Sequence, residues 1–402
     1  MAPSGRLAPR MGMIGASPTA AISDTVRTLA ASGVTVDNLG EGELDFDTPA
    51  PIAEAGIAAI RAGLTKYTAV AGTTGLKDAI RAYFRQRNGL DFAQNEVIAS
   101  CGAKQIIFNA FLATLDAGDE VIVPTPCWVS YPDMIRLAGG TPVLVPCHAS
   151  NGWKLTPEDL AAAITPRTRW VILNSPNNPT GAVYPAAELG ALCDVIAPHD
   201  NVMIMADDIY EAIVFDTTFA TPAALRPALA SRILTINGVS KSFSMTGWRL
   251  GYAGGPSWLI AALDTLQSQS TSNPSSISQN AARAALSGGV GFLDEWLPIL
   301  RRRRAIVMDM VRTTPGLDAV LPEGAFYVFA DVSGCLNRTT PSGQVLRTDV
   351  DFATYMLEAA RVALVPGSAF RAPGHVRIAF GVDTDVLAAC CARMHTACMA
   401  LQ

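Results

Sequence analysis

One loop carries more chemical information than any other part of the chain: residues 237–252, with the sequence NGVSKSFSMTGWRLGY. Short apolar runs at residues 233–236 and 250–253 flank it, and we expect both to be strands. The loop holds Lys241 among small residues and, eight positions later, Arg249. A lysine held among small residues can be desolvated and made nucleophilic, and a guanidinium suits a phosphate. The loop therefore predicts a nucleophilic lysine beside an anion site.

On both sides of this loop, from about residue 97 to residue 255, short apolar runs rich in β-branched residues alternate with longer helix-like stretches. This alternation predicts an α/β domain with a mostly parallel central sheet and helices on both of its faces. The further expected strands cover residues 121–124, 142–146, 170–173 and 202–206. The expected helices include residues 103–115, which we expect to end at the glycine of Asp116-Ala117-Gly118, and residues 186–196.

Polar residues gather where these strands end. Asn174, Asp207 and Lys241 each follow a predicted strand. Ligands of such sheets bind beyond the carboxyl ends of the strands, so we expect the active site at this edge.

The two ends of the chain have a different pattern. Helices are expected at residues 24–31 and 295–312, followed by a mixed αβ tail. We therefore predict a large domain from residues 50–300 and a smaller α+β domain from residues 1–49 and 301–402. The basic run Arg301 to Arg304 is interpreted as the solvated face of a helix.

Composition narrows the function classes. Of the 402 residues, 50% are hydrophobic and 16% charged, which is enough apolar material for a large core divided between two lobes. The net charge of -5, without a basic stripe, argues against a nucleic-acid partner. No apolar run suits a signal peptide or a membrane span, and the eight cysteines lack metal-ligand spacing. We expect a cytoplasmic protein without a metal site, with most thiols in the core.

Three further motifs admit two interpretations each. Residues 99–105, ASCGAKQ, form a turn into an apolar helix; such a helix N-terminus binds phosphate, although many similar turns bind nothing. Residues 174–181, NSPNNPTG, present asparagines on a proline-constrained turn, or form an ordinary turn. Asp207, at the end of a buried strand, requires a cationic partner or caps a helix.

In this order the motifs resemble those of the class I and II aminotransferases, which have fold type I, and within them the bacterial branch that contains aspartate and prephenate aminotransferases. The resemblance extends from about Ser17 to the end. It is carried by residues 42–49 (GELDFDTP), 66–67 (KY), 102–105 (GAKQ), 128–132 (WVSYP), 178–181 (NPTG), 240–241 (SK), 246–249 (TGWR), 365–367 (VPG) and 375–377 (HVR).

The resemblance implies pyridoxal 5′-phosphate (PLP) as cofactor and a role for each matched residue. Lys241 would hold the cofactor as a Schiff base and move the proton between the substrate α-carbon and the cofactor C4′. Asp207 would keep the pyridine nitrogen protonated. Asn178 and Tyr210 would hydrogen-bond the phenolic oxygen, and Trp128 would stack on the ring rather than serve only as a core residue.

The resemblance also implies a phosphate site shared across a homodimer interface. The groups that would bind the phosphate are the backbone N–H groups of Gly102, Ala103 and Lys104, the side chains of Ser240 and Arg249, and the partner subunit's Tyr67.

By the same resemblance, Arg377 would bind the substrate α-carboxylate in a bidentate manner, where an isolated arginine would suggest a surface ion pair. Gly42, Asn178 and Trp128 would complete that part of the pocket. Thr19 and Lys104 would meet the distal carboxylate of a dicarboxylic substrate; a helix cap for Thr19 and a solvated side chain for Lys104 are the alternatives.

The implied function is PLP-dependent transamination of an amino acid, aspartate or glutamate, with a 2-oxo acid, through a pyridoxamine form. One alternative keeps the cofactor but changes the reaction, as in PLP-dependent lyases, decarboxylases and cyclising enzymes of specialised biosynthesis. A second is a ligand-sensing regulator, which the lack of a helix-turn-helix pattern disfavours.

Two positions depart from the branch pattern. Cys127 stands where close relatives carry an aromatic residue, and we expect it to alter the wall near the cofactor or substrate. Gly238 stands where some branches place a phosphate-binding serine.

Overall fold

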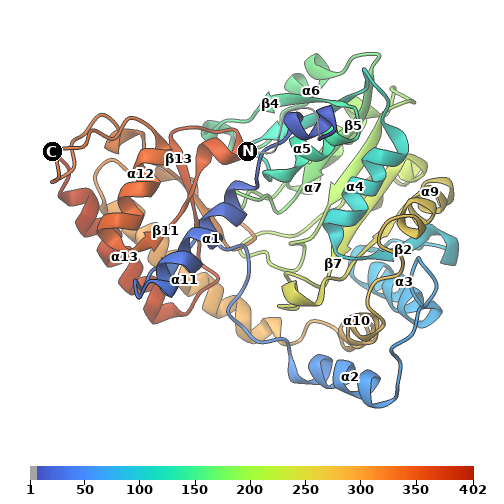
Figure 1. Ribbon diagram of the computed structural model, residues 1–402. Coiled ribbons are helices and arrows are strands. Elements are labelled where there is room, and N and C mark those ends of the chain that lie inside the picture. Colours follow the sequence, from blue (N-terminus) through green and yellow to red (C-terminus); the bar gives the residue numbers. More distant parts are fainter. Residues whose placement is uncertain (1–6) are drawn as a thin grey trace.

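Two main β-sheets organise residues 7–402, the part of the chain that the computed structural model describes (Figure 1). The larger sheet has seven strands. In sheet order they are β2 (Val97–Ser100), β8 (Gly251–Gly254), β7 (Ile233–Gly238), β6 (Met203–Asp207), β5 (Thr168–Asn174), β3 (Glu120–Thr125) and β4 (Thr141–Pro146). Strand β8 runs antiparallel to both of its neighbours, whereas the other pairings are parallel. The predicted α/β class and mostly parallel sheet are confirmed.

Both faces of this sheet are covered by helices because each strand sends alternate apolar side chains to opposite sides. On β6, Ile204 and Ala206 belong to one core cluster, and Met203 and Met205 to another. The first cluster takes in residues of α2 (Ala50–Arg61), α3 (Thr74–Asn88), α6 (Pro157–Ala163), α7 (Ala186–Ile196), α8 (Pro222–Leu225) and α10 (Ser276–Gly288). The second takes in residues of α4 (Ala103–Thr114), α5 (Ser130–Leu137) and α9 (Ser257–Ser268).

The smaller sheet is antiparallel and lies among the C-terminal helices. Its strands, in order, are β12 (Val365–Pro366), β13 (His375–Ala379), β10 (Tyr327–Asp331) and β9 (Asp318–Ala319). The helices are α11 (Leu293–Thr313), α12 (Asp349–Tyr355) and α13 (Thr384–Met399). A separate core cluster fills the space between this sheet and α11 and α13.

The N-terminal segment joins the C-terminal part of the chain. Strand β1 (Asp37–Asn38) pairs in parallel with β11 (Val362–Ala363), more than 300 residues later. Helix α1 (Pro18–Ala31), blue in Figure 1, lies beside the orange and red C-terminal elements. This pairing brings residues 37–49 between the two sheets, where they reach the cavity described below.

Two local predictions are wrong. Helix α4 ends at Thr114 rather than at a glycine cap, because Leu115 takes an extended conformation that buries its side chain in the core. Gly118, with a φ of 97°, lies in the turn before β3.

The basic run is also not a simple solvated face. Arg303 is only 3% exposed and donates to both carboxylate oxygens of Asp45, at 2.6 and 2.8 Å. A buried guanidinium is tolerated there because the bidentate carboxylate satisfies its charge. This pair ties the segment before α2 to α11.

The cysteines and helices agree with the compositional expectations. All eight cysteines are free; Cys101 is half-buried and the others are buried, as predicted. Between residues 7 and 402, no helix combines the length and the apolar character needed to cross a membrane.

Candidate active site

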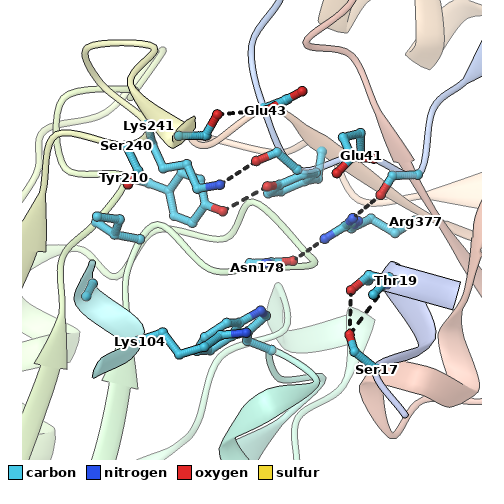
Figure 2. A pocket seen from close by; sticks show the side chains of 18 of the residues that line it. Ser17, Thr19, Glu41, Glu43, Lys104, Asn178, Tyr210, Ser240, Lys241 and Arg377 are labelled. Carbon is cyan, nitrogen blue, oxygen red and sulfur yellow. Dashed lines mark hydrogen bonds between the residues drawn. The ribbon is translucent and has the colours of Figure 1, made fainter. Parts of the chain in front are cut away.

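A cavity of about 480 Å³ opens at the carboxyl ends of the central strands, between the large sheet, the small sheet and α1 (Figure 2). Asn174 and Asp207 are the last residues of β5 and β6, and Lys241 follows three residues after β7. All three line the cavity. The three side chains expected at this edge of the sheet therefore meet around one cavity, where ligands of such sheets bind.

Nearly all of the predicted site residues come together here. Those that line the cavity are Thr19, Gly42, Ala103, Lys104, Trp128, Asn178, Asp207, Tyr210, Ser240, Lys241, Arg249 and Arg377. Gly102 lies directly behind Ala103 as the residue that precedes α4. Tyr67 is 90% exposed and lies outside the cavity.

Lys241 extends toward the N-terminal segment. Its Nζ donates a hydrogen bond to the carbonyl oxygen of Gly42. Burial, and next the nearby charge of Arg377, lower the pKa of Lys241 from 10.5 to about 8. A large share of this amine is therefore neutral, and able to act as nucleophile or base, slightly above neutral pH.

Asp207 presents one satisfied and one unsatisfied oxygen. The Tyr131 hydroxyl donates to Oδ2, whereas Oδ1 is buried and has no hydrogen-bond partner within residues 7–402. Burial raises the pKa of Asp207 to about 6, opposed by the Tyr131 hydroxyl. Asp207 ends a strand and no helix begins with it, so the helix-cap interpretation is wrong and the need for a donor or cation at Oδ1 remains.

Arg377 is 2% exposed and therefore forms no surface ion pair. Its Nη1 donates to Asn178 Oδ1 at 2.9 Å, and its Nη2 to the Gly40 carbonyl at 2.6 Å. The ring centroid of Tyr327 lies 4.4 Å from the guanidinium carbon, and the Tyr327 hydroxyl is 2.8 Å from that of Tyr210. In the described chain, Nε has no partner, which leaves this cation with donor capacity in the cavity wall.

An anion site lies at the N-terminus of α4. The N–H groups of Ala103 and Lys104 make no hydrogen bond within the described residues, whereas that of Gly102 donates to Ser100 O at 2.7 Å. Arg249 reaches this point: its Nη2 would lie 2.6 Å from a Cβ built on Gly102. Free amides at a helix N-terminus beside a guanidinium suit a phosphate. The expected contribution of the Gly102 amide is not available, because that group is already bonded.

The side of the cavity near α1 carries hydroxyls and a second cation. Ser17, not Thr19, caps α1, so the cap interpretation of Thr19 is wrong; the two hydroxyls are 3.0 Å apart. Lys104 Nζ lies 4.8 Å from the ring centroid of Trp128 and lines the cavity, although Lys104 as a whole is exposed, so the solvated alternative stays open. Burial, followed by Arg249, lowers the pKa of Lys104.

The sequence matches the family model described as aminotransferase class I and II over residues 34–394. The chain belongs to the class I and II aminotransferases. The aspartate/prephenate aminotransferase of Cereibacter sphaeroides is 52% identical over 386 residues, 96% of each chain. The aspartate aminotransferase of Rhizobium meliloti strain 1021 is 50% identical over 392 residues, 97% of this chain and 96% of the relative.

Solved structures agree with this membership. The crystal structure of an aspartate aminotransferase from Rhizobium meliloti has a TM-score of 0.95 at 49% identity, covering 99% of this chain and all of that one. The Thermus thermophilus aspartate aminotransferase with maleate has a TM-score of 0.91 at 40% identity, covering 97% and 99%. The chain is a fold-type-I aminotransferase that uses PLP, as the sequence motifs predicted.

The cavity of this aminotransferase fits PLP on three independent features. Asp207 Oδ1 is a buried acceptor without a donor among residues 7–402, and it could accept from a protonated ring nitrogen. The free amides of α4 lie beside Arg249 and suit a phosphate group. Lys241, with a pKa near 8, is an amine able to add to an aldehyde.

The two departures from the branch pattern lie outside this aminotransferase's cavity. Cys127 packs with Tyr131 in the core behind the cavity, so the expected change in the cavity wall is not found. Burial raises the pKa of its thiol to about 12. At Gly238, a Cβ would approach Ile209 and the Leu250 carbonyl at 3.1 Å, which leaves little room for serine.

Several cavity residues of this aminotransferase were not singled out from sequence. These are Ser17, Ser23, Arg27, Glu41, Glu43, Tyr131, Thr246 and Tyr327. Tyr131 stands inside the WVSYP motif, and its place three residues after Trp128 could have suggested a role at the site. Nothing local marks Tyr327, which meets Tyr210 across 117 residues of sequence.

Proposed function

We propose that this aminotransferase moves the amino group of a dicarboxylic amino acid, aspartate or glutamate, to a 2-oxo acid. The main support is that the cavity is lined by cationic and hydroxyl groups in two places. Arg377 lies at one end, and Thr19 of α1 and Lys104 of α4 both lie lower in the view, Thr19 below Arg377 and Lys104 at the lower left (Figure 2). Two carboxylates of one substrate would each find a partner. The Thermus relative was solved with maleate, which is itself a dicarboxylate.

We assign the cofactor to the residues at the carboxyl edge of the sheet. The Ala103 and Lys104 amides, Ser240 and Arg249 would hold the phosphate of PLP. Asp207 Oδ1 would accept the ring N–H, and Tyr210 and Asn178 would bind the phenolic oxygen. When bound, PLP supplies an aldehyde carbon that takes up the amino group and a ring that withdraws electrons from the substrate α-carbon.

The remaining steps belong to the protein. Lys241 Nζ would take the proton from the substrate α-carbon and return it to the carbon on the other side of the amino nitrogen, two bonds away, since its lowered pKa suits both tasks near neutral pH. Arg377, with Asn178 and the backbone of Gly42, would hold the α-carboxylate so that the α-carbon faces Lys241. The indole of Trp128 would form one wall and exclude water from the reacting atoms.

We further propose a homodimer whose partner subunit's Tyr67 completes each phosphate site. Tyr67 is almost fully exposed here, and Ile57, Ile60 and Leu64 on or near α2 are exposed apolar side chains close to it in sequence. An exposed apolar patch of this kind is typical of an interface. A cytoplasmic location and a division into a large domain (50–300) and a small domain (1–49 and 301–402) complete the proposal.

The alternative of a lyase, decarboxylase or cyclising enzyme is not favoured, because the relatives that match over the full length are aminotransferases by name. The two kinds of reaction also differ in where the nitrogen goes. A transaminase passes it to the oxo acid, an eliminating lyase releases it as ammonia, and a decarboxylase or cyclising enzyme keeps it in the product.

The deciding experiment incubates the PLP-loaded enzyme with 2-oxoglutarate and one amino acid at a time, and measures oxaloacetate, glutamate and ammonia. We expect aspartate to give equal amounts of oxaloacetate and glutamate without ammonia, and Lys241→Ala to give neither product. Ammonia release in place of glutamate would refute transamination. Activity confined to apolar amino acids would refute the dicarboxylic substrate.

A further inference from the structure

Glu41 has no role in the site as described so far, although it lines the cavity. It stands between two residues whose carbonyl groups are bonded to the central cations. Gly40 O accepts from Arg377, and Gly42 O accepts from Lys241. A displacement of Glu41 would therefore shift the carbonyl groups that bind Arg377 and Lys241.

The Glu41 carboxylate connects this segment to helix α1. Ser23 Oγ, on α1, donates to Glu41 Oε2 at 2.5 Å, and Asn38 Nδ2 donates to the same oxygen at 3.0 Å. Asn38 in turn accepts from the Gly40 N–H at 2.9 Å. A continuous set of hydrogen bonds thus runs from α1 through Glu41 and Asn38 to Gly40, whose carbonyl binds Arg377.

Helix α1 has few other attachments in the described chain: Ile22 packs against the apolar cluster that contains Val365 and Phe370. Within Pro18–Ala31, Ser23 is the one buried residue, at 8% exposure. On the side of α1 that faces α12, an apolar groove of about 380 Å³ separates Ile22 and Val26 from Ala353 and Leu357. Because apolar packing there is incomplete, the bond from Ser23 to Glu41 becomes a main attachment of the helix.

The Ser23 hydroxyl has one hydrogen and two acceptors within reach. The carbonyl of Thr19, in the same helix, is 3.3 Å away, and the Glu41 carboxylate oxygen is closer, at 2.5 Å. The closer acceptor makes the stronger bond. The hydroxyl therefore ties α1 to Glu41 rather than to its own helix.

We propose that Glu41 is a positioning residue that fixes α1, and with it Ser17 and Thr19, relative to Arg377. The distance between Arg377 and Thr19 sets the length of dicarboxylic substrate that the cavity accepts. Glu41 thereby determines the preference between aspartate and glutamate, which differ by one methylene group. This inference rests on the proposed dicarboxylic substrate and adds a residue that governs its length.

The test measures kcat and KM of the PLP-loaded enzyme for aspartate and for glutamate. We expect Glu41→Ala and Ser23→Ala to raise the KM for the preferred substrate about tenfold, the effect of losing one hydrogen bond, and to narrow the ratio of the two KM values. The kcat for that substrate should change less than about threefold. Glu41→Gln, whose amide oxygen can accept from both donors, should restore most of the loss.

Thr28→Ala is the matched control, because Thr28 also bonds the carbonyl four residues earlier on α1 but is exposed. It should leave both KM values unchanged. Hydrogen–deuterium exchange should show faster exchange across residues 18–31 in Glu41→Ala than in Thr28→Ala, with the rest of the chain unaffected.

The outcomes separate this inference from the proposed function. If the wild-type enzyme does not use dicarboxylic substrates, the proposed function fails. If it does, but Glu41→Ala keeps both KM values and their ratio, the positioning role fails. A Glu41→Gln variant as impaired as Glu41→Ala would also overturn it, because the negative charge rather than the attachment of α1 would then be responsible.

Discussion

Two buried polar atoms in the cavity wall, Asp207 Oδ1 and Arg377 Nε, lack partners within residues 7–402. Unsatisfied buried groups cost free energy, so they persist where a ligand satisfies them during function. At the scale of single residues, we propose that the cofactor ring satisfies Asp207 and that the substrate carboxylate satisfies Arg377. Each leads to a prediction.

Removal of the buried guanidinium should impair substrate binding. We expect Arg377→Ala to raise the KM for aspartate by about a hundredfold or more, because a buried bidentate carboxylate contact is worth about 3 kcal/mol. Arg377→Lys should recover only part of this, since an ammonium group lacks the planar fork. Steady-state kinetics with aspartate as the varied substrate provide the measurement, and an unchanged KM would contradict the assignment.

Ionised Asp207 should oppose folding of the PLP-free protein above about pH 6. Its folded-state pKa of about 6 lies above the ordinary value of 3.8, so folding disfavours the ionised form. This penalty is absent below about pH 4, grows between pH 4 and 6, and is complete above pH 6, at about 3 kcal/mol. We expect Asp207→Asn to raise the Tm of the PLP-free protein at pH 8 but not at pH 4.

The same substitution should weaken function. The introduced amide could still accept from the Tyr131 hydroxyl but could not neutralise a protonated ring nitrogen, so PLP-dependent activity should fall while the PLP-free protein becomes more stable. Equal Tm changes at pH 4 and pH 8 would show that ionisation of Asp207 is not the cause.

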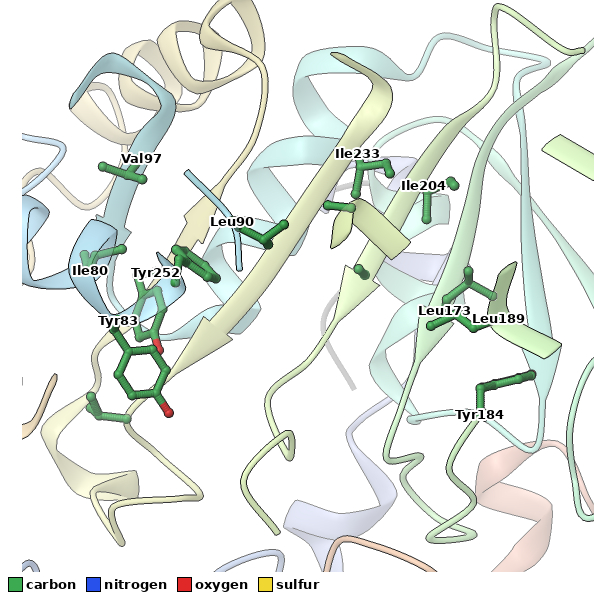
Figure 3. Packing of buried hydrophobic residues seen from close by; sticks show 14 of the residues in the cluster. Ile80, Tyr83, Leu90, Val97, Leu173, Tyr184, Leu189, Ile204, Ile233 and Tyr252 are labelled. Carbon is green, nitrogen blue, oxygen red and sulfur yellow. The ribbon is translucent and has the colours of Figure 1, made fainter. Parts of the chain in front are cut away.

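At the scale of elements, the site depends on how strands and helices meet. Figure 3 shows side chains from five adjacent strands of the large sheet, which share one core cluster with residues of α3 and α7. The labelled strand residues are Val97, Tyr252, Ile233, Ile204 and Leu173, and the helix residues include Ile80, Tyr83 and Leu189. This packing holds the strand ends in register, and thereby Asp207 and Asn174 at one edge.

The phosphate site depends on a close contact between β8 and α4. A Cβ on Gly251 would lie 2.2 Å from the Ala103 amide nitrogen. We expect Gly251→Ala to displace the first turn of α4, with its two free N–H groups, and to weaken PLP binding at least tenfold. Gly288→Ala is the control, because nothing lies within 4 Å of that position.

Fluorescence titration of the PLP-free variants with PLP gives the two dissociation constants. The prediction fails if Gly251→Ala binds PLP as tightly as the wild-type protein does, because the backbone would then have accommodated the methyl group without moving the amides.

At the scale of the whole molecule, the proposed homodimer makes activity depend on assembly. Ile60 and Leu64 are 54% and 49% exposed, and they lie near the still more exposed Tyr67 in the sequence. We expect the double substitution Ile60→Glu and Leu64→Glu to produce monomers and to weaken PLP binding, since a buried charge opposes association.

Light scattering coupled to size-exclusion chromatography measures the assembly state. Val386→Glu, an equally drastic change at an exposed apolar position on α13, should leave the mass and the PLP affinity unchanged. A dimeric double variant with normal PLP affinity would place the interface elsewhere.

The sequence predicts a structural feature well when the residues that determine the feature are close together in the chain. The short apolar runs between helix-like stretches predicted the strands to within a few residues. A strand that is buried on both faces of a sheet is marked by its own neighbouring residues, so the signal is local in sequence. Helix α7 was predicted at the observed residues, 186–196. The glycine cap predicted for α4 is absent because Leu115 leaves the helix in an extended conformation and packs in the core. The loop around Lys241 and the GAKQ turn were recognisable because their chemistry is contiguous in sequence.

The sequence by itself determined the family, the parallel sheet, and the side chains that meet at its carboxyl edge. Only the tertiary structure decided which residues distant in sequence hydrogen-bond to one another. These pairs are Tyr131 with Asp207, Tyr327 with Tyr210, Asp45 with the buried Arg303, and Ser23 with Glu41. The physical reason is that local patterns report burial and turn chemistry, whereas a contact between distant side chains exists only once the two sheets and the N-terminal segment have packed together.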